Sequence, residues 1–188
     1  MTRIPLIFGM GVVGLQSLSL GTVSEEKAAG IGAIFCKHSF APHFPTEHQL
    51  LQQIGSGTLA HVENSEYRVY RHAKTNLWIG CRIDEENRVE RPITGILVSE
   101  IPLVPQRSVP SVRFSFPCSS LHSVRIGDSV ADALAKCGRP LRTYNTRFIK
   151  EANLLVYEYF PKSLEVGSCI RFFALRNRVV AISFSSEE

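Results

Sequence analysis

Apolar and polar positions with helical spacing stand out most clearly between Val124 and Pro140. Four apolar residues there follow an i, i+3, i+4, i+7 pattern and form one stripe on a helix: Val130, Ala133, Leu134 and Cys137. Ser129 is a suitable N-cap, with Asp132 three residues later. Gly138 and Pro140 are suited to ending a helix. A helix of about two to three turns is marginal alone in water, so this one is expected to pack against the strands that follow it.

A second helix with similar start and stop signals is predicted over Thr46 to Ile54. Thr46 can cap its first turn, and Gly55 can end it. Its apolar residues share one face: Leu50, Leu51 and Ile54. Each half of the chain is therefore expected to begin its ordered part with a short amphipathic helix.

Alternating or β-rich runs follow both helices and predict strands. In the first half these runs are Tyr67 to Arg71, Asn76 to Asp84 and Arg88 to Ser99. In the second half they are Leu141 to Thr146, Leu154 to Phe160, Ser168 to Arg176 and Arg178 to Ser185. Between the halves, the proline-rich segment from Ile101 to Pro117 leaves room for an edge strand at most, over Ser111 to Phe116.

The two halves show a weak internal similarity at an offset of about ninety residues. Matching pairs are Tyr67 with Tyr157, Tyr70 with Phe160, and Asn87-Arg88-Val89 with Asn177-Arg178-Val179. The pattern predicts an α+β fold made of two helix-plus-antiparallel-β-meander units. The expected divisions are 1–23 (signal or N-terminal tail), 24–104 (first, weaker repeat), 105–122 (linker) and 123–188 (second repeat).

The second repeat resembles the SmpA/OmlA family, small lipoproteins of the outer-membrane assembly machinery, in the β-lactamase inhibitory protein-like fold group. The shared motif residues are Gly127, Val130, Leu134, Gly138 and Pro140, followed by an aromatic strand at Val156 to Tyr159 and the run Asn177 to Ile182. These are turn and core residues, so the resemblance implies a fold and carries over no catalytic residue. The chain departs from the lipoproteins in having a second copy and no lipobox.

Composition limits the function classes and leaves the compartment open. The 188 residues include 21 basic and 17 acidic ones, a net charge of +4, and the basic residues are scattered. A nucleic-acid binder usually concentrates them into a stripe, so no nucleic-acid partner is expected. The apolar run from Ile4 to Leu15, with small residues before Gly21, predicts either an export signal or an N-terminal strand or tail. Export to the periplasm or cell envelope is favoured over the cytoplasm, with peripheral membrane association as one form of it.

Metal-ligand side chains gather at one place, Cys36, His38, His43 and His48. Their spacing matches no closed zinc site, and two prolines interrupt the segment, so a polar connector is favoured over a metal centre. A thiol hydrolase could be drawn from Cys81 with His72 or from Cys36 with His48, but neither pair lies in a recognisable catalytic motif, and Cys81 in a β-rich run is better explained as a core residue. No metal or other cofactor is expected. Cys137 and Cys169 could pair as a disulfide in an exported chain, with two buried thiols as the alternative.

Aromatic residues alternate along the predicted strands, above all Tyr67, Tyr70, Trp78, Tyr157 and Tyr159. They predict either an exposed binding face on the open side of the sheets or a core beneath the helices. The leading hypothesis is a non-enzymatic protein-binding or scaffold domain. The alternatives are an inhibitor-like protein that docks on an enzyme, and a thiol- or metal-dependent enzyme around Cys36 and its histidines.

Overall fold

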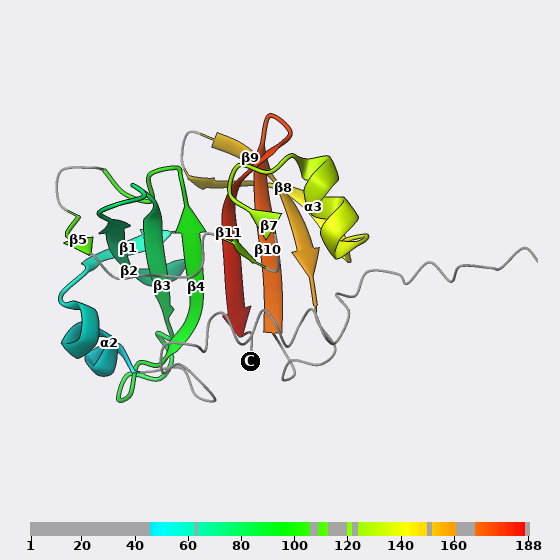
Figure 1. Ribbon diagram of the computed structural model, residues 1–188. Helices are drawn as coiled ribbons and strands as arrows, with labels where there is room; N and C mark the ends of the chain where they lie inside the picture. Colours follow the sequence, from blue (N-terminus) through cyan, green and yellow to red (C-terminus); the bar gives the residue numbers. More distant parts are fainter. Residues whose placement is uncertain are drawn as a thin grey trace, which may run out of the picture.

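A computed structural model of the chain shows one broad antiparallel sheet with two short helices (Figure 1). The structure describes residues 46–62, 64–105, 109–112, 120–121, 124–149, 152–160 and 168–186. The helices are α2 (Glu47–Ile54) and α3 (Val130–Cys137). The strands are β1 (Thr58–Val62), β2 (Ser65–His72), β3 (Trp78–Ile83), β4 (Ile93–Ser99), β5 (Ser111–Val112), β6 (Ser120–Leu121), β7 (Val124–Arg125), β8 (Arg142–Ile149), β9 (Ala152–Tyr159), β10 (Ser168–Leu175) and β11 (Arg178–Ser186).

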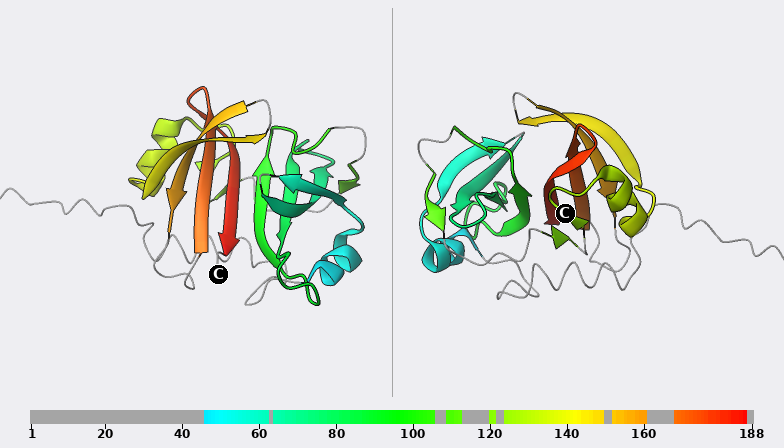
Figure 2. Two further views of the ribbon diagram at one scale, coloured as in Figure 1. Left: turned by 180° about the vertical axis from the view of Figure 1, so that it is seen from behind. Right: turned by 45° about the horizontal axis from the view of Figure 1, so that its top comes forward.

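The strand order in the large sheet is β1-β2-β3-β4-β11-β10-β9-β8, with every neighbour antiparallel. The short β5 adds to β2 in parallel, and β6 pairs with β7 in a separate two-stranded sheet. The first and second halves of the chain meet where β4 pairs with β11, with Ser99 opposite Ala181 and Gly95 opposite Ser185. In the rear view of Figure 2, β1 and β2 run across β3 and β4, and β8 and β9 run across β10 and β11, so the sheet curls at both ends.

The expected fold class, an α+β protein of two helix-plus-meander units, is wrong. Strands dominate the part of the chain that the structure describes, and its helices are two elements of eight residues each. The eight long strands form a single sheet because β4 and β11 pair along five positions. The long strands of the two halves therefore do not form two separate meander sheets, and the protein is better described as mostly β.

Both helices lie on the same face of this sheet. Tyr159, Phe172 and Ile182 pack beneath α3 with Ala133 and Cys137 in one buried cluster. Tyr70, Ile79 and Cys81 pack beneath α2 with Leu50 in another. Because side chains alternate across a strand, the residues between these belong to the opposite face. We call the face that carries α2 and α3 the helix face, and the opposite face of the sheet the open face.

The middle of the open face is covered by the connector that follows β4. Ile101, Leu103, Val104 and Val109 pack there against a buried cluster that includes Trp78, Leu97 and Phe173. Leu103 lies so close to β3 that a Cβ on Gly80 would be 3.2 Å from its Cδ1. The proline-rich segment predicted as a linker thus contributes to the core in its described part.

Both helices begin and end as the sequence predicts. Thr46 forms a full capping box with Gln49, and the Ser129 hydroxyl accepts a hydrogen bond from the Asp132 amide at 3.1 Å. Gly55 and Gly138 end the helices with positive φ. A tyrosine from the sheet then holds each end, since the hydroxyls of Tyr70 and Tyr159 donate to the carbonyls of Gly55 and Gly138. The ninety-residue offset had instead paired Tyr70 with Phe160.

Candidate functional site

A row of polar side chains crosses four neighbouring strands on the open face. Glu158 in β9 faces Arg142 in β8 on one side and Arg171 in β10 on the other. Arg171 in turn faces Ser183 in β11. Opposite charges at facing positions of an antiparallel sheet attract one another across the strands. We call these four residues the polar row.

Glu158 is the centre of the polar row, and its side chain is only 4% exposed. Its Oε2 accepts a hydrogen bond from Arg171 Nε at 2.7 Å and another from the Tyr144 hydroxyl at 3.1 Å. Arg142 Nη1 lies 3.9 Å from the other carboxylate oxygen, and Arg171 also donates to Ser185 Oγ. Burying a carboxylate is costly unless it is paired and hydrogen-bonded, and these partners meet that cost.

Burial raises the pKa of Tyr144 to about 12, against the lowering effect of the nearby Arg171. Its hydroxyl therefore keeps its proton at physiological pH and acts as a hydrogen-bond donor to Glu158. Together with Tyr144, the polar row brings two guanidinium groups, one carboxylate and two hydroxyls to one face of the sheet, and such groups bind polar ligands.

The polar row ends at β8, the last strand of the sheet. Side chains along β8 are exposed on both faces, including Arg142, Tyr144 and Arg147, and Leu141 just before it is 55% exposed. Arg142 lies above the Phe160 ring, 5.9 Å from its centroid, which keeps the guanidinium close to the strand. Within the described ranges no strand pairs with the outer edge of β8. An edge of this kind presents backbone N–H and C=O groups that another extended segment can pair with.

Charge is unevenly divided between the halves of the chain. Between residues 124 and 186 there are ten basic and five acidic residues, whereas residues 46–105 contain six basic and eight acidic ones. The segment 141–149, which includes β8, contains two arginines and no acidic residue, whereas Lys136 just before it is paired with Asp128 at 2.7 Å. The exposed strand therefore lies in a locally positive part of the molecule.

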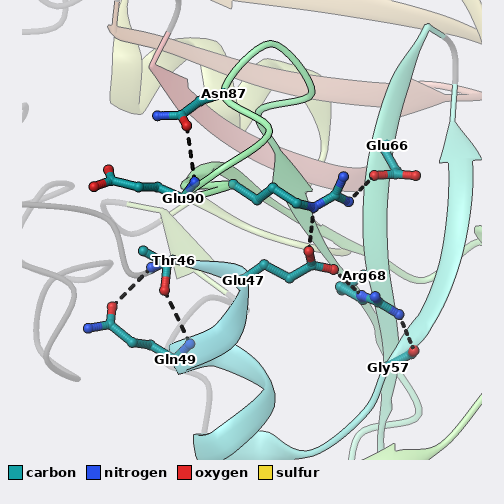
Figure 3. A network of polar contacts seen from close by, with 9 residues as sticks. Thr46, Glu47, Gln49, Gly57, Glu66, Arg68, Asn87 and Glu90 are labelled. Carbon is teal, nitrogen blue, oxygen red and sulfur yellow. Dashed lines mark hydrogen bonds and ion pairs between the residues drawn. The ribbon is translucent and has the colours of Figure 1, made fainter.

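A second group of charges has a structural role beneath α2 (Figure 3). Glu47 in the first turn of α2 pairs with Arg68 of β2 and with Arg91 of the β3–β4 loop, and Arg91 also pairs with Glu66. Burial acts to raise the pKa of Glu47, but the hydrogen bonds from the two arginines outweigh it and lower the pKa. The group fixes α2 to the sheet and to the loop, with its carboxylates already paired.

The predicted aromatic face is not a single surface. Tyr70, Trp78 and Tyr159 are at most 1% exposed, and Tyr67 and Tyr157 are half-buried against the core clusters. The five residues are also divided between the faces: Tyr67 and Trp78 on the open face, and Tyr70, Tyr157 and Tyr159 on the helix face. The core interpretation holds for the three buried rings because the helices and the connector cover both faces of the sheet.

The residues of the suspected metal and thiol sites are not brought together in the described structure. Cys36, His38 and His43 lie outside the described residues, and His48 on α2 contacts Gln52 at 2.9 Å. No group of three or more metal-ligating side chains occurs where the structure describes the chain. Cys81 is buried, and burial raises the pKa of its thiol to about 12, so it is protonated at neutral pH.

Cys137 and Cys169 are both buried and form no disulfide. Cys137 packs on the helix face, whereas Cys169 precedes Arg171 by two positions and so belongs to the open face. The sheet separates them, and the buried-thiol alternative is correct.

The motif residues that carried the family resemblance have structural positions. Val130, the first residue of α3, is buried, and Leu134 in the same helix is half-buried. Gly127 and Gly138 have positive φ, and Pro140 follows the helix end. The resemblance to the SmpA/OmlA family stays a prediction.

Sequence reasoning missed the polar row. The available signal was the acidic Glu158 two positions after Val156, at a position of β9 that alternation assigns to a buried face. An arginine at the matching position of the next strand, Arg171, was the second part of that signal.

The comparisons with known proteins bear on the fold alone. No protein-family model matches the chain, and no curated protein matches it either. Among solved structures it is similar to YjgB, a DUF4309 family protein from Bacillus subtilis, with a TM-score of 0.52 and 9% sequence identity. The match covers 87% of this chain and 97% of that one. In the described part of the chain, no helix is long and apolar enough to span a membrane.

Proposed function

We propose that the protein is a non-enzymatic protein-binding domain and that it binds through the outer edge of β8. The observation that carries this proposal is the exposure of residues 142–145 and 147 of β8, the terminal strand of the sheet, whose outer edge pairs with no strand in the described ranges. Edge strands are a recurring site of peptide recognition because their backbone groups can pair with an added strand.

The polar row supports the same proposal. Glu158 and Arg171 are held by several hydrogen bonds, so β8 is attached to a rigid base through Arg142 and Tyr144. A rigid site loses little conformational entropy on binding, which favours affinity. Tyrosine and arginine are also enriched among residues that contribute most to protein–protein binding.

The test is selection of peptides from a random display library on the full-length protein, followed by hydrogen exchange of the protein with a selected peptide. We expect saturable binding and slower amide exchange in residues 142–149, while exchange in β1, the opposite edge, stays unchanged. Failure to select any saturable binder, or protection confined to regions other than β8, would contradict the proposal.

A further inference from the structure

The geometry points to an acidic, extended segment of a partner protein as the occupant of the β8 edge, added to the sheet as a further strand. This inference rests on the proposed function and names the chemistry of the partner. It follows from two independent properties of β8, its backbone and its charge.

The backbone requires an extended partner. β8 spans eight residues, Arg142 to Ile149, and pairs with β9 on its inner side, with an irregularity between Thr146 and Ile149. A strand added on the outer side would lie about 4.8 Å away and pair with the N–H and C=O groups that point outward. A helix cannot satisfy those groups, because its own backbone bonds are internal.

The side chains select the charge of that partner. Arg142 has 70% of its side chain exposed, and Arg147 is exposed on the same strand. Residues 141–149, which include the whole strand, contain these two arginines and no acidic residue. The nearest carboxylate on the neighbouring strand, Glu158, is already bonded to Arg171 and Tyr144. Carboxylates on the incoming strand would therefore meet two exposed guanidinium groups, of which Arg142 lies 3.9 Å from the Glu158 carboxylate and Arg147 lies further along the strand.

The same charges disfavour a second copy of this chain as the occupant. Pairing β8 with β8 of another copy would bring four arginines onto one two-stranded ribbon with no carboxylate on either strand. Like charges on facing strands are destabilising, and charged edge residues are a common means of preventing self-association.

The experiment measures binding of synthetic ten-residue peptides to the full-length protein by fluorescence anisotropy at low ionic strength. The first peptide alternates glutamate with valine and threonine, and the second replaces each glutamate by lysine. The third keeps the glutamates but carries N-methyl groups on alternate amides, which removes strand pairing and leaves the charge unchanged. We expect the acidic peptide to bind at least about tenfold more tightly than either of the others.

Two charge reversals locate the interaction. Replacing both exposed arginines of the strand, R142E/R147E, is expected to reverse the preference towards the lysine peptide. The matched control Arg139→Glu makes the same kind of charge change off the strand, and it should weaken binding by no more than about threefold. Circular dichroism of both variants checks that the sheet is retained.

Each alternative outcome has a defined meaning. Equal binding of the acidic peptide and its N-methylated form would overturn strand addition, and equal binding of a single-stranded oligonucleotide of the same charge would favour a nucleic-acid ligand instead. A concentration-dependent dimer that R142E/R147E abolishes would assign the edge to a second copy. If library-selected peptides protect β8 but carry no acidic residues, the inference fails while the proposed binding function stands.

Discussion

At the residue scale, Glu158 is a carboxylate at a buried position of the sheet, where it is paired with Arg171 and accepts a hydrogen bond from Tyr144. Its removal should leave Arg171, whose side chain is 20% exposed, without its closest partner. We expect Glu158→Ala to lower the free energy of unfolding by about 3 kcal/mol, since loss of one member of a buried ion pair leaves an uncompensated charge. Urea unfolding of the purified variant measures this.

The control for that prediction is the other arginine of the polar row. Arg142 is 3.9 Å from Glu158 and 70% exposed, so Arg142→Ala should cost less than about 1 kcal/mol. Equal losses for Glu158→Ala and Arg142→Ala would show that burial does not distinguish the two contacts.

A second residue-scale prediction concerns the Cys81 thiol. It is buried beneath α2, and burial raises its pKa to about 12, so the thiolate is scarce at pH 8. We expect no alkylation of Cys81 by iodoacetamide in the native protein and full alkylation in denaturant, measured site by site with mass spectrometry. Rapid labelling of native Cys81 would contradict its assignment to the core.

At the scale of elements, the attachment of α2 should depend on pH. The pKa of Glu47 is lowered in the folded state, so its ion pairs stabilise the fold fully above the unfolded value near 4.5. That contribution disappears as the pH falls through the lower folded pKa. We expect R68A/R91A to show a shallower loss of stability with acidification than the unmodified protein, measured by urea unfolding at a series of pH values. Arg88→Ala, a change in the same loop, should keep the original slope.

The local elements were predictable from sequence because their signals are local. The caps at Thr46 and Ser129 and the ends at Gly55 and Gly138 depend on residues within one turn, and all four are confirmed. β1 was missed because it is a short, partly exposed edge strand after a glycine-rich turn, without a continuous apolar pattern. The predicted helices and strands were thus largely correct where hydrophobic periodicity was strong.

The arrangement of those elements could not be read in the same way. Whether Tyr70 or Trp78 is exposed depends on what covers each face, and the cover comes from α2 and from the connector around Leu103. The polar row likewise needs the register between β8, β9 and β10, which brings Arg142, Glu158 and Arg171 together. Such pairings lie between distant parts of the chain and leave little trace in any one segment.

At the scale of the whole molecule, the pairing of β4 with β11 determines that the protein has one sheet. The strands that meet there are about eighty residues apart in sequence, as Ser99 and Ala181 show. Because apolar residues from both strands share one buried cluster, including Ile96, Val98 and Ile182, the two halves should unfold together.

Gly95 is where this junction is most sensitive to substitution. A Cβ at Gly95 would lie 2.8 Å from the carbonyl oxygen of Phe184 and 3.0 Å from Ser185 Cβ, so β11 would have to move away. We expect Gly95→Ala to lower the free energy of unfolding by about 2 kcal/mol, as overpacking of a buried site does. The measurement is urea unfolding followed by the fluorescence of Trp78, the only tryptophan, and by far-UV circular dichroism.

The two probes also test whether the junction couples the halves. In the unmodified protein the Trp78 and circular dichroism transitions should coincide, whereas in Gly95→Ala the first half should unfold separately and the transitions should diverge. The double variant G95A/S185G removes the side-chain contact but keeps the backbone oxygen in place, so it should recover little stability. Full recovery of stability in the double variant would assign the effect to the Ser185 side chain. Unchanged stability of Gly95→Ala would show that β11 can shift without cost, and this would contradict a tight junction between β4 and β11.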